Sequence, residues 1–260
     1  MKRVSCRYCG RKCCNKERMT ALFAEFKRQF IKCFIEKNRW KFLFNGLGVT
    51  LRITLFAVLL GIAIGVVVAI VRATHDKNVK TMRPGFGRFM LKFVNGICRI
   101  YLTVIRGTPV IIQLMIIYYV IFASSSNGVL IGTLAFGINS GAYVAEIIRG
   151  GIMSIDNGQF EAGRSLGFNY VQTMRYIILP QAFKNVLPSL ANEFIVLLKE
   201  TSVSGYVAVQ DLTKGGDIIR GATYISFMPL LAVAAIYLVM VIFFSWLVSL
   251  LEGRLRRSER

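Results

Sequence analysis

The chain alternates long apolar segments with short basic ones. Three segments contain no Asp, Glu, Lys, Arg or His, namely residues 53–71, 107–145 and 222–251. A helix needs about 20 mostly apolar residues to cross a bilayer, and each segment is close to or beyond this length. Because the polar stretch 124–128 divides the longest segment in two, the pattern predicts four membrane-spanning helices.

A fifth span is expected over residues 183–206, although Lys184, Glu193, Lys199 and Glu200 make it a poor one by hydropathy. Charges at bilayer depth are costly, so we expect the polar side chains of this span to face protein rather than lipid. The sequence therefore predicts an all-α membrane protein with five transmembrane helices, at about residues 47–72, 96–123, 129–150, 183–206 and 226–251.

Basic residues indicate the orientation of these spans. They gather after the first span, after the third span and at the C-terminus, and five spans place these three segments on one face, which is cytoplasmic. The formal net charge of +20 then reflects topology and contact with anionic lipid, not nucleic-acid binding. The cations are Arg72, Lys77, Lys80, Arg83, Arg88 and Lys92, then Arg149, Arg164, Arg175 and Lys184, and finally Arg254, Arg256, Arg257 and Arg260.

The N-terminal segment departs from this rule. Residues 1–45 hold thirteen Lys or Arg against three Glu, yet an odd number of spans places them outside. Apolar residues spaced by three and four favour a helix that lies on the membrane surface, and the intervening charges exclude a sixth span. We expect a basic, Cys-rich segment over 1–45, a transmembrane domain over 46–252 and a basic tail over 253–260. The apolar residues are Leu22, Phe23, Phe26, Phe30 and Phe34.

Little in the composition favours an enzyme or a metal protein. Four of the six cysteines form the pattern C-x-x-C-x-x-x-C-C near the N-terminus, but adjacent cysteines chelate one tetrahedral ion poorly and no second paired motif follows. The chain has one histidine, His75, and no G-x-x-x-x-G-K-[ST]. We therefore expect no catalytic residue, no metal site and no cofactor bound by this chain itself.

The polar loop at about 154–182 has the signature of two capped helices. Asp156 with Gln159 favours a helix start, Gly167 favours its end, and Asn169 with Gln172 favours a second start. Pro180 should close or kink the second helix. The first helix and the elbow expose three apolar side chains, which favours a protein partner with a groove, although a solvated loop of ordinary helical propensity stays an alternative. These side chains are Phe160, Leu166 and Phe168.

Residues 161–180, EAGRSLGFNYVQTMRYIILP, resemble the EAA motif of binding-protein-dependent ABC importers, E-A-A-x-x-x-G followed after nine residues by I-x-L-P. Gly163 replaces the second alanine. Residues 101–114, 137–156, 178–202 and 211–216 are similar to the permease subunits of polar amino-acid ABC importers. The resemblance covers about residues 40–252. The matching motif residues are Glu161, Ala162, Gly167, Ile177, Leu179 and Pro180.

The resemblance implies a type I ABC importer permease fold with a cytoplasmic coupling helix, in a bacterial cytoplasmic (inner) membrane. It implies a dimer of cytoplasmic ABC ATPase subunits that holds ATP and Mg, an extracellular or periplasmic amino-acid-binding protein, and a second permease subunit, either a second copy or a homologue. A polar or charged L-amino acid would pass by alternating access. The expected ATPase-coupling residues are Glu161, Ala162, Gly163, Leu166, Gly167 and Phe168.

Three polar residues of the predicted spans are candidates for the substrate pathway. Asn139 and Glu146 lie two helical turns apart and should share one face, where they would receive the ammonium group of an amino acid. Arg106, taken as a buried cation, or local helix N-termini would receive the carboxylate. The alternative is that Arg106 and Glu146 pair with each other or with Arg149 and contact no substrate.

The outer end of the span predicted at 183–206 also matches the family, at Lys199, Glu200 and Thr201. An intersubunit contact is the first interpretation of these residues, and an outer gate is the second. Two other functions stay open: a proton-coupled secondary transporter that uses Glu146, and a non-transporting membrane scaffold. Neither accounts for both the capped loop and the intramembrane polar residues.

Overall fold

A computed structural model describes residues 11–79, 84–125, 127–207 and 209–257, and within these residues the fold is all-α without a strand. Short π or 3-10 turns interrupt or extend several helices; they are η1 (Ile31–Ile35), η2 (Glu36–Asn38), η3 (Ile117–Ile121), η4 (Met174–Ile178) and η5 (Thr201–Val207). The α-helices are α1 (Arg11–Phe30), α2 (Trp40–Asn78), α3 (Phe86–Gly107), α4 (Val110–Ile116), α5 (Gly128–Met153), α6 (Asn157–Ser165), α7 (Tyr170–Thr173), α8 (Leu179–Glu200), α9 (Leu212–Thr223) and α10 (Phe227–Arg257).

Three helices among the described residues are long and apolar enough to cross a membrane, and they lie in α2, α5 and α10. They confirm the predicted spans at 47–72, 129–150 and 226–251. The span predicted at 183–206 falls on α8 and η5, which length and composition do not identify as a crossing. The count of five spans therefore stays a prediction.

The span predicted at 96–123 falls on two helices that pass together as one apolar segment but are sharply bent. The first helix begins earlier, at Phe86, ends at Gly107, and is bent by 108° from the helical segment Val110–Ile121. Pro109 has no N–H to continue a helix and disfavours helical geometry at the residue before it, and Thr108 is extended, with φ −120° and ψ 145°. By length and composition, the described residues contain a fourth crossing if this bent pair forms one span.

Helices α2 and α5 form the centre of the bundle, where small residues let the two backbones approach closely. A Cβ atom on Gly65 would lie 2.5 Å from Cγ1 of Val144, and one on Gly61 would lie 3.0 Å from Oγ of Ser140. Gly61 and Gly65, one helical turn apart, therefore form the close-packing face of α2. On α8, Glu193 is buried and accepts a hydrogen bond from Ser140 (3.0 Å). Lys199 is exposed, so only part of this helix's charge faces protein.

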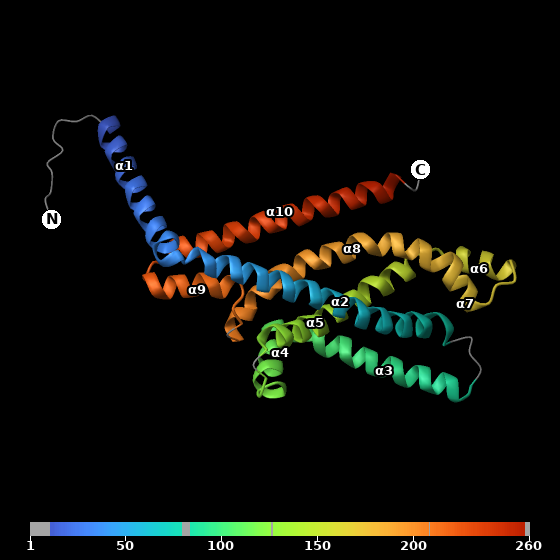
Figure 1. Ribbon diagram of the computed structural model, residues 1–260. Coiled ribbons are helices and arrows are strands. Elements are labelled where there is room, and N and C mark those ends of the chain that lie inside the picture. The colour runs from blue at the N-terminus through green and yellow to red at the C-terminus, as the bar shows by residue number, and fades with distance from the viewer. Residues whose placement is uncertain (1–10, 80–83, 126, 208, 258–260) are drawn as a thin grey trace.

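The two ends of the bundle differ in what they carry. Helices α6 and α7, the start of α3 and the end of α10 lie at one end, and α1 and α9 lie at the other (Figure 1). The segments that follow the first and third spans and the C-terminal helix end thus share one end, as the distribution of basic residues predicts.

Candidate functional site

The loop between α5 and α8 is a helical elbow, formed by α6, Gly167 and α7. Gly167 has φ +80°, a conformation that glycine adopts without strain. The N–H of Phe168 donates to the carbonyl of Gly163 (3.0 Å), and that of Gly167 donates to Arg164 (2.9 Å). This pair of bonds is a Schellman end, so the predicted helix end is confirmed.

The two predicted helix starts differ in how they are capped. Asn169 and Gln172 form the full reciprocal capping box, with both bonds at 2.9 Å. Asp156 caps α6 through the N–H of Gly158, but the predicted reciprocal bond from Gln159 is absent, because that side chain pairs with Gln181 of α8 at 3.3 Å. Pro180 does not end the second helix. It lies in the first turn of α8, which continues from η4.

Gly163 is the point where the two arms of the elbow touch. A Cβ atom there would lie 2.7 Å from Cγ2 and 2.8 Å from Oγ1 of the buried Thr173. The glycine that replaces the alanine of the family motif therefore fits this chain's own threonine ten residues later.

Gly163→Ala should loosen the elbow, because overpacking at such a contact costs about 1–3 kcal/mol. Cleavage by trypsin at the exposed Arg164 and Arg175 measures this opening, and it should accelerate roughly tenfold. The double variant Gly163→Ala/Thr173→Ala, which removes both contacting atoms, should return the rate to that of Thr173→Ala alone. If the cleavage rate of Gly163→Ala equals that of wild type, the contact between Gly163 and Thr173 does not contribute to the stability of the elbow.

Apolar side chains cover the outer surface of the elbow. Leu166 is 71% exposed, Val171 69% and Tyr176 63%, and Phe168 contacts the ring of Tyr176 with centroids 6.3 Å apart. The expectation that Phe160 is presented outward is wrong, because it packs against the buried cluster that includes Ala73 and Ile152. We define Leu166, Val171 and Tyr176 as the elbow patch.

Lys77, near the end of α2, attaches α6 to the first span. Its Nζ donates to Oδ1 of Asn157 (2.6 Å) and lies 4.4 Å from the ring centroid of Phe160. These residues line one pocket together with Glu161, Arg164 and Tyr170. Burial raises the pKa of the Tyr170 hydroxyl above its ordinary value. From the sequence, Lys77 was interpreted only as one of the basic residues that indicate the orientation of the spans.

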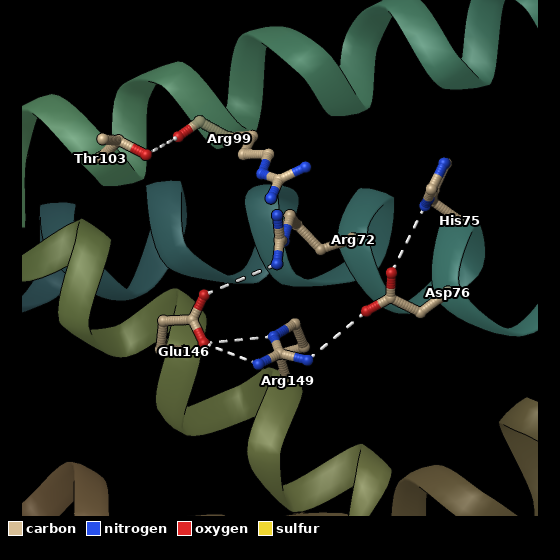
Figure 2. Close-up of polar contacts among 7 residues, drawn as sticks. All are labelled: Arg72, His75, Asp76, Arg99, Thr103, Glu146 and Arg149. Atoms are coloured by element: carbon tan, nitrogen blue, oxygen red, sulfur yellow. Dashed lines mark hydrogen bonds and ion pairs between the residues drawn. The ribbon is translucent and has the colours of Figure 1, made fainter.

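A second charged pocket, of ≈ 350 Å³, lies between α2, α3 and α5. Glu146 on α5 pairs with Arg149 (2.9 Å) and, at 4.0 Å, with Arg72 on α2. Arg149 also reaches Asp76 (3.4 Å), and the side chain of Arg99 on α3 projects toward Arg72 (Figure 2). We call this group the arginine pocket; it is lined by Arg72, Arg99, Leu102, Thr103, Arg106, Gly107 and Glu146.

The three predicted pathway residues are only partly brought together. Arg106 and Glu146 both line the arginine pocket, but Arg106 is exposed instead of buried and lies 5.6 Å from the ring centroid of Tyr143. Among the described residues, the ion pairs of Glu146 go to Arg149 and Arg72, not to Arg106. Asn139 is not a lining residue of this pocket.

Asn139 lies instead at the break between α3 and α4. Its amide donates to Oε1 of Gln113 (3.1 Å), and Gln113 donates to the carbonyl of Ile105 (2.7 Å) and to Oγ1 of Thr108 (2.7 Å). Gln113 thus satisfies backbone groups that the break leaves without helical partners. Gln113 was missed from the sequence because an amide within an apolar run gives no signal of its partners.

The residues at the outer end of α8 are in different environments. Thr201 is fully buried, donates to the carbonyl of Leu198 (2.8 Å) and lies 3.4 Å from Oγ1 of Thr54 on α2. Glu200 is half-buried and Lys199 is exposed. Thr201 therefore fastens α8 to α2 within one chain.

Within the described residues no three His, Cys, Asp or Glu side chains form a metal-binding group, and the side chains of Cys6, Cys9, Cys13 and Cys14 lie outside the described part.

Charged residues held between long apolar helices, together with an exposed polar elbow, are typical of a multi-pass membrane protein. The chain belongs to the family described as binding-protein-dependent transport system inner membrane component, which matches residues 85–257. Members of this family are the membrane-embedded components of their transport systems. The recognised motif, the fold and the family match agree on this class.

Several relatives of this chain are permeases of amino-acid transport systems. A glutamine transport system permease, GlnP, of Rickettsia bellii is 40% identical over 60% of this chain and 72% of its own length. GlnP of Escherichia coli is 36% identical over 66% and 81%. A solved amino acid ABC transporter with histidines is 41% identical, with a TM-score of 0.73 over 85% of this chain and 98% of that one. The MetNI methionine ABC transporter, 20% identical with a TM-score of 0.68, shares the fold.

Proposed function

We propose that this protein is the permease subunit of an ATP-driven importer for a polar L-amino acid in a bacterial inner membrane. Two permease subunits would enclose one pathway, a binding protein would deliver the amino acid from outside, and a pair of cytoplasmic ATPase subunits would hold ATP and Mg. The observation that carries the proposal is the 41% identity to an amino acid ABC transporter over 85% of the chain. In this arrangement α8 also crosses the membrane, and together with α2, the bent pair, α5 and α10 it completes five crossings.

The elbow is the coupling element in this proposal. It lies at the end of the bundle that carries the basic segments, and the elbow patch gives a partner an apolar surface on rigid, capped helices (Figure 1). Glu161, Ala162 and Arg164 are exposed beside this patch. Closure of the ATPase pair would move α6, and the attached spans would tilt between inward-open and outward-open states.

The arginine pocket is the part of the pathway that suits an amino acid. Arg106 has no carboxylate partner among the described ion pairs and can receive a carboxylate group. Glu146 supplies the negative charge that an ammonium group requires, although it must share that charge with Arg149. Asn139 has a positioning role in this proposal. It hydrogen-bonds to Gln113, which stabilises the break between α3 and α4 beside this pocket. We place the substrate between Arg106 and Glu146.

Reconstitution tests the proposal directly. The permease is placed in liposomes with its ATPase and binding protein, and uptake of radiolabelled glutamine is measured with and without ATP. We expect uptake that requires ATP and the binding protein and is abolished by vanadate. Uptake that persists without ATP and collapses with an uncoupler would instead assign a proton-coupled transporter. Absence of uptake for every polar amino acid would contradict the proposal.

Lys77→Met should loosen the coupling between ATP hydrolysis and transport. The variant keeps the apolar stem over Phe160 but loses a charged hydrogen bond and a cation–π contact, together worth about 1–3 kcal/mol. We expect more ATP hydrolysed per amino acid imported, with unchanged amounts of assembled complex. Lys92→Met, which removes the same charge from an exposed position of α3, is the matched control and should keep the wild-type ratio. Equal ratios in both variants would exclude a coupling role for Lys77.

A further inference from the structure

Helix α1 is not explained by the importer function. It precedes the part of the chain that matches the family, residues 85–257. In Figure 1 it diverges from the bundle at the end opposite α6 and α7 and runs across the direction of α10. Such a helix needs either a partner or a surface on which to lie.

The turn after α1 fixes this direction. Cys33 and Phe34 are buried in a cluster with Leu43, Leu212 and other residues of α9 and α10. Lys37 and Asn38 have φ 54° and 53°, so the chain changes direction before α2 begins. Non-glycine residues adopt this conformation only where the surrounding structure requires it. The C-terminal end of α1 is therefore anchored to the bundle, while the rest of the helix projects freely.

One face of α1 is apolar and exposed. Met19, Phe23, Phe26 and Phe30 are spaced by four, three and four residues, so they align along the helix, and their exposed fractions lie between 45% and 67%. The surrounding charge is basic, since residues 19–41 contain six Lys or Arg and only two Glu. Arg28 is already paired with Glu25 at 2.8 Å, whereas Lys27, which flanks the apolar face, and Lys32, just beyond the end of α1, have no ion pair among the described residues.

Trp40 marks the depth at which α1 leaves the bundle. It is the first residue of α2, which is a membrane-crossing helix, and its half-exposed ring packs edge-on against Phe44 with centroids 5.5 Å apart. Tryptophan at the end of a span is typical of the interface between headgroups and acyl chains. The turn at Lys37 and Asn38 lies immediately before Trp40, so α1 departs at headgroup depth.

We propose that α1 is an in-plane anchor that binds the anionic headgroups of the bilayer. Phe23, Phe26 and Phe30 lie at the acyl boundary, and Lys27 and Lys32 extend their ammonium groups to lipid phosphates. Orientation, an aligned aromatic face and positive charge coincide here, and together they distinguish a lipid surface from a protein groove. The anchor depends on the membrane-crossing fold and not on the identity of the transported molecule.

Tryptophan fluorescence in lipid nanodiscs tests the anchor. The chain has two tryptophans, so a Trp40→Phe/Trp246→Phe background allows single probes. Phe26→Trp reports the apolar face, and Ala24→Trp, on the opposite side one turn before Arg28, is the matched control. Acyl-brominated phospholipids quench from the lipid side and acrylamide quenches from water. In nanodiscs with phosphatidylglycerol we expect bromolipid quenching several-fold stronger for Phe26→Trp, and acrylamide quenching several-fold stronger for Ala24→Trp.

Three results would overturn the proposal. Equal acrylamide quenching of both probes would place α1 in water. Protection of the Phe26→Trp probe from both quenchers would mean that a second protein covers this face. Identical quenching in phosphatidylcholine nanodiscs would exclude anionic headgroups as the binding partner. We expect instead that Lys27→Gln/Lys32→Gln in phosphatidylglycerol reproduces the weaker bromolipid quenching of the phosphatidylcholine sample.

Discussion

A Leu166→Asp permease should insert and fold normally but fail to hold its ATPase subunits. Leu166 is 71% exposed, so the aspartate remains solvated in the free permease and costs little. In the assembled importer the same carboxylate would be buried against an apolar groove without a partner. Removal of a central apolar anchor costs about 2 kcal/mol or more, and a buried charge adds to that, so affinity should fall at least roughly 30-fold. Binding of the purified ATPase to permease nanodiscs measures the loss.

Leu166→Met is the matched control, since it keeps the volume and apolar character of the side chain. It should bind within about threefold of wild type. Trypsin resistance at Arg164 and Arg175 verifies that the elbow of each variant is intact. If Leu166→Asp binds the ATPase as tightly as Leu166→Met, the elbow patch is not the docking surface, and the coupling role of α6 must be abandoned.

Much of the fold was predictable because its signals are local. Uninterrupted apolar runs define α2, α5 and α10, and the elbow follows from side chains that cap their own backbone, as Asn169 and Gln172 do. The 108° bend after Gly107 could not be predicted in size from the sequence. Asn139 and Gln113 hydrogen-bond at this break, and that contact joins residues 26 positions apart in the sequence.

The candidate site was less predictable, because charge type does not reveal partners. The pairing of Glu146 with Arg149 was one predicted alternative, and it is confirmed. Arg72 was counted only as a topological cation, yet it reaches Glu146 once α2 and α5 pack together. Arg106 was expected to be buried because it lies beside a long apolar run, but the bend leaves it exposed. Phe160 was expected outside, because the sequence does not show that Lys77 and α2 cover that face of α6.

Glu146→Gln should reduce uptake by about tenfold or more. The change removes the only carboxylate that lines the arginine pocket among the described residues, and it leaves Arg72 and Arg149 without their shared anion. Truncating one partner of a partly buried charge pair is costly because the remaining charges stay poorly solvated. Lower uptake alone therefore has two explanations: the loss of a substrate contact, or damage from unpaired arginines.

The double variant Glu146→Gln/Arg149→Gln separates these explanations. Removing Arg149 together with Glu146 eliminates the closest unpaired cation, so the amount of folded protein and the ATP-driven conformational cycle should recover. If Glu146 receives the ammonium group, uptake should stay about tenfold below wild type, and the concentration of binding-protein-bound amino acid needed for half-maximal uptake should rise. Full recovery of uptake in the double variant would show that Glu146 serves only to neutralise arginines, and the substrate would then have to be placed elsewhere. Arg149→Gln alone provides the reference for the loss of the cation.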